Sequence, residues 1–206
     1  MTGVPDRLVI RPARAADCPA MTEIYNHGIR GRMATFEERE RTPDELEAWL
    51  GDPMPVLVAE RDGRVVGFSR VKPFSAREVF AGVGDHGIYV APDQQRQGIG
   101  RALLDALAQA AAAQGMWKLT SRIFVSNAGS IAAHQAAGFR IVGVQHRDGL
   151  VDGVWRDVVL VERLIGRALD GDGNGQVVSD VERERDAVGE QPPAQRQHCA
   201  AESEPA

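Results

Sequence analysis

Hydrophobic positions along the chain recur with two periods, and their succession predicts a sheet flanked by helices. Short apolar runs rich in β-branched and aromatic side chains predict strands over residues 8–10, 56–60, 65–71, 88–90, 119–125, 141–145 and 154–161. Apolar residues spaced three and four apart predict helices over about residues 17–27, 43–50, 100–114 and 131–137. Strands at the front, alternating strands and helices in the middle and a final strand pair predict a mixed α/β fold.

Cap and turn residues set several of the expected boundaries. Asp17 is placed to cap the first helix, and Thr42 begins a capping-box pattern for the second. Asp62 and the glycine after it are typical of a hairpin turn, and Gly138 suits the position just after a helix. Residues 28–41 between the first two helices have no clear period, and a loop of this length is often a binding loop.

Composition excludes several classes of function. The chain has 206 residues, is 43% hydrophobic and 26% charged, and carries a net charge of −5, which gives general nucleic-acid binding no electrostatic support. The first 18 residues lack the apolar core of a signal peptide, and no later run approaches the roughly 18 apolar residues of a membrane span. Cys18 and Cys199 indicate neither a disulfide framework nor a thiolate metal site. We expect a cytoplasmic protein without metal, nucleic-acid or membrane partners.

The composition changes sharply after about residue 167. Residues 167–206 are polar and charged with almost no large apolar side chains, and such a segment cannot bury enough surface to offset its ordering entropy. The sequence therefore predicts one domain over residues 1–166 and a disordered tail over residues 167–206.

The segment over residues 88–104 carries the strongest local signal for a ligand site. A strand ends at Pro92, a glycine-containing loop follows over residues 95–100, and a helix begins there. Unpaired backbone N–H groups, the helix dipole and glycine together suit an anion such as phosphate. By itself this segment is equally well explained as an ordinary strand–turn–helix connection.

Three short motifs occur in one order: Gln95-x-x-Gly98-x-Gly100, then Asn127-x-x-Ser130, then His134 with Gly138-Phe139. This order and spacing resemble the GNAT superfamily of acetyl-CoA-dependent N-acetyltransferases over residues 8–164. The resemblance implies the GNAT fold, a twisted, mostly antiparallel sheet flanked by helices, with acetyl-CoA as acetyl donor. It implies donor-binding roles for Ile88, Tyr89, Val90, Gln95, Arg96, Gln97, Gly98, Ile99, Gly100, Arg101, Asn127 and Ser130.

Further matches are similar to the phosphinothricin acetyltransferase branch of that superfamily. They include residues 24–27, 35–36, 72–74 and 88–90, and the Gly-x-Trp-x-Asp-Val pattern of residues 153–158. Members of the branch acetylate phosphinothricin, methionine sulfoximine and sulfone, and arsinothricin, which are toxic amino acids with a free α-amino group. The resemblance implies substrate-binding roles for Asn26, Phe36, Lys72, Phe74 and Arg77.

Candidate catalytic residues follow from the chemistry of amine acetylation. The amine must lose a proton before it attacks a thioester, and a carboxylate or an imidazole can accept that proton. The branch usually has a glutamate at the position of Asp85, so Asp85 is the expected base, with His86 as an alternative. His134 occupies the position where many relatives place a tyrosine near the departing thiolate, which suggests a proton donor.

Two departures from the branch lie at the substrate end. Residues 149–152 lack an aromatic and a basic residue that the branch commonly has. Arg70 and Lys72 are more basic than the small or aromatic residues often found there.

The sequence thus predicts an acyltransferase that acetylates the α-amino group of a small amino-acid-like substrate, with a role in detoxification or antibiotic resistance. Members of the branch are commonly dimeric, so a homodimer is expected. Acetylation of another amine, such as a protein N-terminus, a polyamine or an aminoglycoside, is an alternative. A non-catalytic sensor that binds acetyl-CoA is another.

Overall fold

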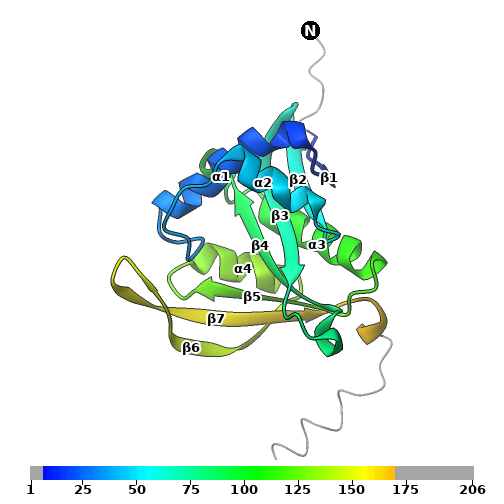
Figure 1. Cartoon of the computed structure of the whole chain (residues 1–206), viewed down its shortest axis with the longest axis vertical. Helices are drawn as coiled ribbons and strands as arrows, with labels where there is room; N and C mark the ends of the chain where they lie inside the picture. Colours follow the sequence, from blue (N-terminus) through cyan, green and yellow to red (C-terminus); the bar gives the residue numbers. More distant parts are fainter. Residues whose placement is uncertain (1–6, 170–206) are drawn as a thin grey trace, which may run out of the picture. The chain divides into compact units, whose positions relative to one another are not determined.

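The protein is built on one seven-stranded sheet, seen in a computed structural model that describes residues 7–169 (Figure 1). Its strands in chain order are β1 (Val9–Pro12), β2 (Val56–Arg61), β3 (Arg64–Pro73), β4 (Val83–Val90), β5 (Lys118–Phe124), β6 (Arg140–Val151) and β7 (Val154–Leu164). They lie in the order β1-β2-β3-β4-β5-β7-β6. Only β4 and β5 pair in parallel among the described residues. The expected mixed, mostly antiparallel sheet is therefore confirmed.

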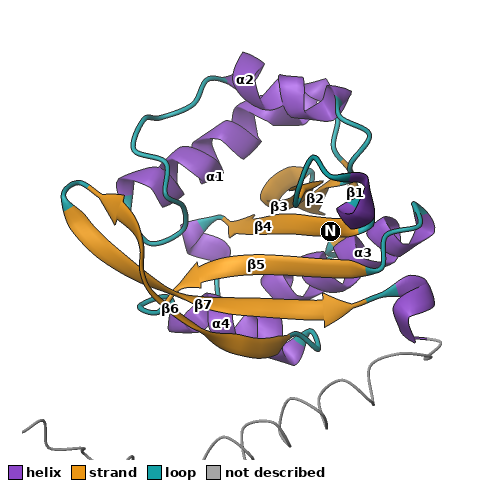
Figure 2. Cartoon of the chain, turned by 60° about the horizontal axis from the view of Figure 1, so that its bottom comes forward, coloured by secondary structure: helices purple, strands orange, loops and turns teal. Residues whose placement is uncertain are grey.

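Helices cover both faces of this sheet (Figure 2). They are α1 (Cys18–Arg30), α2 (Pro43–Glu47), α3 (Ile99–Ala113) and α4 (Ala128–Ala136). Helices α1 and α2 pack with Val58 and Phe68 on one face, whereas α3 packs with Leu57, Val71 and Leu119 on the other. The donor-binding segment predicted from the sequence lies on the α3 side, and the loop after α1 lies on the opposite side.

The apolar stripe predicted for the 100–114 helix is the centre of the larger core. Leu103, Leu104 and Leu107 of α3 are fully buried, as is Ala111 one turn further along. Burying each leucine side chain stabilises the fold by about 1.5–3 kcal/mol. This packing fixes the N-terminus of α3 beside the end of β4.

Most predicted boundaries agree with the structure, but Asp17 does not cap α1. Its carboxylate accepts hydrogen bonds from both terminal nitrogens of Arg11, at 2.7 and 2.8 Å, and from the backbone of Arg14. A charged guanidinium is a stronger partner than a helix amide, so the side chain turns toward β1. Thr42 does form the predicted capping box with Glu45.

Four strands, β3, β4, β6 and β7, are each at least three residues longer than the sequence pattern predicts. β4 begins at Val83 rather than at residue 88, and β6 and β7 extend past residues 145 and 161. The added part of β4 contains Gly84, Asp85 and Gly87, which have low strand propensity, but it pairs throughout with β3. Tertiary pairing therefore overrides local preference in the strand that carries the predicted base.

The described chain ends with a short 3-10 turn, Gly166–Leu169, beyond the expected domain boundary at residue 166. Within this turn the guanidinium of Arg167 lies over the ring of Trp117, 4.6 Å from its centroid. The rest of the predicted tail, residues 170–206, lies outside the described residues. None of the helices in residues 7–169 is long and apolar enough to cross a membrane.

Candidate active site

The centre of the sheet opens between its two parallel strands. β4 and β5 pair over only three positions, the last being Asp85 opposite Thr120. Beyond this point β4 continues to Val90 and β5 to Phe124 without pairing to each other. The hydroxyl of Ser121 donates to the backbone oxygen of His86 (2.8 Å) where the strands begin to separate.

This separation leaves backbone groups of β4 without strand partners. Ala91 N–H donates to Val66 on the β3 side, and Val83 C=O accepts from Phe74 on the same side. Because backbone groups alternate in direction along a strand, those of Ile88 and Val90 face β5 instead. The N–H groups of these two residues therefore point into the opening, as the donor-binding role predicted for them requires.

A cavity of about 1230 Å³ occupies the opening and continues to both faces of the sheet. It is lined by β3, β4 and β5, by the loop after α1, and by the N-terminal ends of α3 and α4. Among the predicted site residues, the lining includes Phe36, Lys72, Asp85, Ile88, Tyr89, Val90, Gln95, Arg96, Gly98, Ile99, Gly100, Arg101, Asn127, Ser130 and His134.

The α3 end of the cavity is suited to an anion. Gly98 precedes the helix with φ +80°, a conformation that favours glycine, and a side chain there would project into open space. The first helical hydrogen bond runs from Ala102 N–H to Gly98 C=O (3.0 Å). The preceding N–H groups at the helix start have no partner within the helix, and the helix dipole adds partial positive charge. This end can hold a phosphate or pyrophosphate.

Asn127 joins α4 to the loop after α1. Its side-chain oxygen accepts from Ser130 N–H (3.0 Å) and thus caps α4, while its amide nitrogen donates to the backbone oxygen of Met33 (2.9 Å). Ring contact between Phe36 and Phe124, with centroids 4.7 Å apart, holds the same loop against β5. The loop over residues 31–42 therefore forms a wall of the cavity.

His86 of β4 and His134 of α4 form a buried pair. Their Nε2 atoms are 3.1 Å apart, and Nδ1 of His134 lies 2.7 Å from the backbone oxygen of Ser130. Only an N–H can approach a carbonyl so closely, so His134 carries its proton on Nδ1 and accepts at Nε2 from His86. Burial lowers the pKa of His86 to about 3 and also lowers the pKa of His134, so both rings are neutral.

This arrangement bears on the two histidines named as candidates from the sequence. His86 contacts His134 of α4 and Phe139, whereas its neighbour Asp85 faces the opposite side of the sheet and pairs with Lys72. This geometry favours Asp85 over His86 as the base, and both roles stay predictions. The N–H of neutral His134 is hydrogen-bonded to the backbone oxygen of Ser130, and the predicted role of His134 as a proton donor stays a prediction. The pair holds α4 against β4.

Asp85 lies on the α1 side of the sheet, beside two cations of β3. Its carboxylate is 3.2 Å from the ammonium of Lys72, and its side chain is mostly buried. The guanidinium of Arg70 lies 3.9 Å from the ring centroid of Trp49, in the turn that follows α2. A carboxylate and two cations thus face the same half of the cavity.

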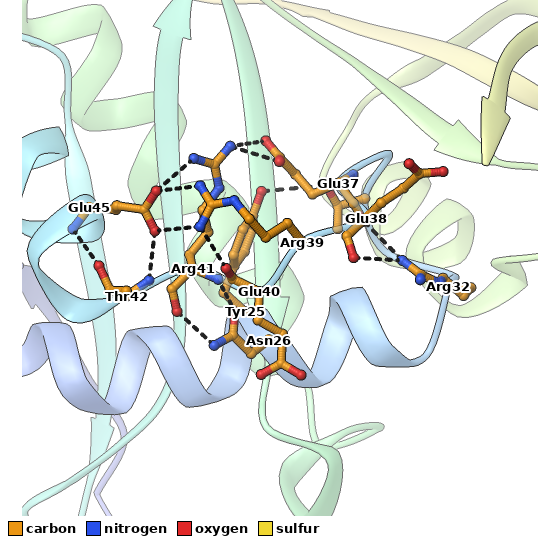
Figure 3. Close-up of polar contacts among 11 residues, drawn as sticks. Tyr25, Asn26, Arg32, Glu37, Glu38, Arg39, Glu40, Arg41, Thr42 and Glu45 are labelled. Atoms are coloured by element: carbon orange, nitrogen blue, oxygen red, sulfur yellow. Dashed lines mark hydrogen bonds and ion pairs between the residues drawn. The ribbon is translucent and has the colours of Figure 1, made fainter. Parts of the chain in front are cut away.

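Four predicted site residues lie outside the cavity lining: Asn26, Phe74, Arg77 and Gln97. The side chain of Asn26 is buried and bonds both backbone groups of Arg41, which fixes the loop after α1 (Figure 3). Phe74 packs on Phe80, and Arg77 is exposed in the turn that contains it. Gln97 accepts from Arg61 and donates to the backbone of Asp93. The contacts of these four side chains in the structure are therefore structural, and their predicted binding roles stay predictions.

The sequence did not identify several lining residues as functional. They are Tyr25, Trp49, Arg70, Ser121 and Arg122. The unusual basic character of Arg70 was a usable signal, whereas the others resembled ordinary apolar or strand residues. No cluster of three or more metal-binding side chains occurs within residues 7–169.

Comparison with known proteins agrees with this geometry. The acetyltransferase (GNAT) family matches residues 20–139. The L-methionine sulfoximine/L-methionine sulfone acetyltransferase of Salmonella typhimurium is 34% identical over 161 residues, 75% of this chain and 93% of that protein. The phosphinothricin N-acetyltransferase of Alcaligenes faecalis is 36% identical over 160 residues, 75% of this chain and 81% of that protein.

A solved structure gives the same result. The phosphinothricin acetyltransferase of Sinorhizobium meliloti in complex with AcCoA superposes with a TM-score of 0.74 at 29% identity, covering 84% of this chain and 96% of that one. The family match over residues 20–139 includes strands β4 and β5, the Gly98 loop and the start of α4. The chain therefore belongs to the acetyltransferase (GNAT) family.

Proposed function

We propose that this protein transfers the acetyl group of acetyl-CoA to the α-amino group of a small amino acid of the phosphinothricin, methionine sulfoximine or sulfone, or arsinothricin type. One observation carries the proposal: a single cavity connects the anion-binding end of α3 to the Asp85–Lys72 pair through the opening between β4 and β5. Relatives named for these substrates, at 34% and 36% identity, support the acceptor class.

Acetyl-CoA is the acetyl donor, and the residues present fit it. The loop around Gly98 and the first turn of α3 would hold the pyrophosphate through backbone N–H groups. The N–H groups of Ile88 and Val90, which have no partner on β5, face the pantetheine arm and the thioester, while Val90 C=O accepts from the side chain of Gln95. When bound, acetyl-CoA supplies the activated acetyl group.

Asp85 is the proposed base, acting directly or through a water molecule. It faces the acceptor half of the cavity, and its carboxylate can take the proton that the amine must lose before it attacks. The N–H groups of Ile88 and Val90 are positioned to stabilise negative charge that develops on the thioester oxygen. Attack forms the amide bond, breaks the carbon–sulfur bond and releases coenzyme A.

Free-thiol release from acetyl-CoA tests this function. The acceptor panel contains phosphinothricin, methionine sulfoximine, methionine sulfone, arsinothricin, proteinogenic amino acids, a polyamine, a peptide with a free N-terminus and an aminoglycoside. We expect thiol release with the toxic amino acids. Activity confined to the aminoglycoside, polyamine or peptide would refute the acceptor class, and acetyl-CoA binding without thiol release would indicate a sensor.

We further propose a cytoplasmic homodimer that detoxifies its substrates and so confers resistance to them. Large apolar side chains are exposed on the edge strand β6 and on its neighbour β7: Ile141, Val142, Val144, Leu150, Val154 and Trp155. Exposed apolar clusters of this kind typically mark interaction surfaces. A toxic amino acid needs a basic α-amino group to imitate glutamate, and acetylation removes this basicity.

A further inference from the structure

The acceptor half of the cavity contains a cation without an anionic partner. Arg70 lies on the cavity face of β3, two residues from Lys72. No carboxylate of the described residues lies within ion-pair distance of Arg70, and its Nε atom is buried without a hydrogen-bond partner. In contrast, Arg41 and Arg122 of the same cavity have ion pairs with Glu37 and Asp148.

The surroundings of Arg70 hold its guanidinium in place without neutralising it. Trp49 stacks against the guanidinium, and Trp49 in turn contacts Tyr25 edge-on, with ring centroids 5.4 Å apart. Burial lowers the pKa of Arg70 and raises that of the nearby Tyr89 phenol, so Tyr89 remains neutral. A partly buried cation without a partner is unfavourable, and a bound anion would remove that penalty.

Strand register places the two cations at different distances from the proposed base. Lys72 is opposite Asp85, and Arg70 is opposite Gly87. Alternate residues of a strand are separated by about 6.6 Å. A substrate amine at Asp85 therefore has its α-carboxylate near Lys72, whereas Arg70 lies further along the cavity, where the end of the substrate side chain would be.

We infer that Arg70 binds an anionic group at the end of the acceptor's side chain, so that the enzyme selects phosphinothricin-like substrates over methionine sulfone and sulfoximine. This inference rests on the proposed function. In phosphinothricin the α, β and γ carbons separate the carboxylate from an anionic phosphinate, and the planar guanidinium can hold two phosphinate oxygens at once. Methionine sulfone has a neutral side-chain terminus and cannot form this ion pair.

The test compares phosphinothricin with methionine sulfone as acceptors. Thiol release gives kcat/KM for both with the wild-type protein, Arg70→Gln, Arg70→Lys and a control, Arg30→Gln, whose arginine is on α1 outside the cavity lining. We expect Arg70→Gln to lower kcat/KM about 10- to 100-fold for phosphinothricin and less than about threefold for methionine sulfone, because only the first loses a charge-assisted hydrogen bond. Arg70→Lys should restore part of the preference, and the control should leave it unchanged.

Equal losses for both acceptors would overturn the inference, because they would place Arg70 at the α-carboxylate or in a purely structural role. No loss for either would also overturn it. Calorimetric binding of both acceptors to the coenzyme A complex separates this result from failure of the proposed function. If no acceptor gives thiol release but phosphinothricin binding still depends on Arg70, the proposed function fails, and only the binding of the anionic side-chain group by Arg70 stands. If neither acceptor binds, both fail.

Discussion

Asp85 lines the cavity and forms an ion pair with Lys72. If Asp85 is the base, its removal should change kcat and the dependence of kcat on pH. Asp85→Asn keeps the size of the side chain but cannot accept the amine proton. We expect kcat at neutral pH to fall about 10²- to 10⁴-fold, the usual range for loss of general-base catalysis, with little change in acetyl-CoA affinity. The measurements are pH–rate profiles by thiol release and calorimetric binding of acetyl-CoA.

The matched control is Asp62→Asn, in the β2–β3 turn outside the cavity lining. Asparagine tolerates the positive φ of this residue, so the control should match the wild type. An Asp85→Asn enzyme that retains the acidic limb of the kcat profile would rule out Asp85 as the base.

The neutral His86–His134 pair predicts how stability depends on pH. An unfolded histidine has a pKa of about 6.5, whereas the folded protein holds the pKa of His86 at about 3 and lowers that of His134. Below pH 6.5 the unfolded chain therefore binds more protons than the folded chain, so stability is lost as the pH falls. Each histidine contributes at most about 1.4 kcal/mol per pH unit.

We expect His134→Gln to be less stable than the wild type at pH 7. Its free energy of unfolding should fall less steeply with decreasing pH, by up to the contribution of one histidine. Urea unfolding at pH 7 and pH 5 measures the change in the free energy of unfolding. The control is His146→Gln, because the His146 side chain is exposed on β6. Identical pH dependence in His134→Gln and the wild type would show that folding does not lower the pKa of His134.

The start of α3 binds the donor in our proposal, and a substitution of the glycine that precedes this helix tests that role. Gly98→Val introduces a side chain into the anion-binding end and strains a residue at φ +80°. Gly63→Val is a matched control, because Gly63 has φ +76° and equally open space, in a turn outside the cavity lining. Both variants should lose about 1–2 kcal/mol of stability.

Only Gly98→Val should raise the KM for acetyl-CoA, by tenfold or more, with kcat nearly unchanged at saturating donor. Initial rates at varied acetyl-CoA give both constants. A KM that rises equally in the two variants would attribute the effect to strain, and an unchanged KM would place the pyrophosphate elsewhere.

Elements defined by local chemistry could be predicted from the sequence, whereas sites built by tertiary pairing could not. Thr42 caps α2, and Gly138 adopts φ +77° after α4, because each depends on neighbours within a few residues. The N-terminal extension of β4 depends on β3, so its composition alone did not reveal it. The same limit explains Asn26, which matched a family pattern but bonds the distant backbone of Arg41.

The catalytic half of the site shows this limit most clearly. Asp85 and Lys72 were each identified from the sequence, but their ion pair follows from the β3–β4 register. The contact between His86 and His134 joins residues 48 positions apart. The loop and helix start at the proposed donor end follow from local sequence, whereas the contacts at the proposed acceptor end depend on the folded chain.

For the molecule as a whole, the exposed surface of β6 and β7 predicts self-association. Leu150 and Trp155 lie opposite each other in the hairpin and are 53% and 56% exposed. Burying both in a second copy would remove a large apolar area from water and cover the free edge of the sheet, which otherwise favours non-specific pairing. We expect a dimer by size-exclusion chromatography with light scattering.

Trp155→Asp should weaken this dimer by at least tenfold, because it places a charge in the apolar interface and removes an aromatic side chain of the kind that dominates interface energetics. Val79→Asp is the control, since Val79 is 74% exposed on a turn far from the hairpin in sequence and contributes to neither core nor cavity. The concentration dependence of the mass shows whether the dimer is weakened, and far-ultraviolet circular dichroism checks that the variant is folded. A wild-type protein that stays monomeric at all concentrations would refute the dimer. A Trp155→Asp protein that dimerises as tightly as the control would show that this surface does not form the dimer interface.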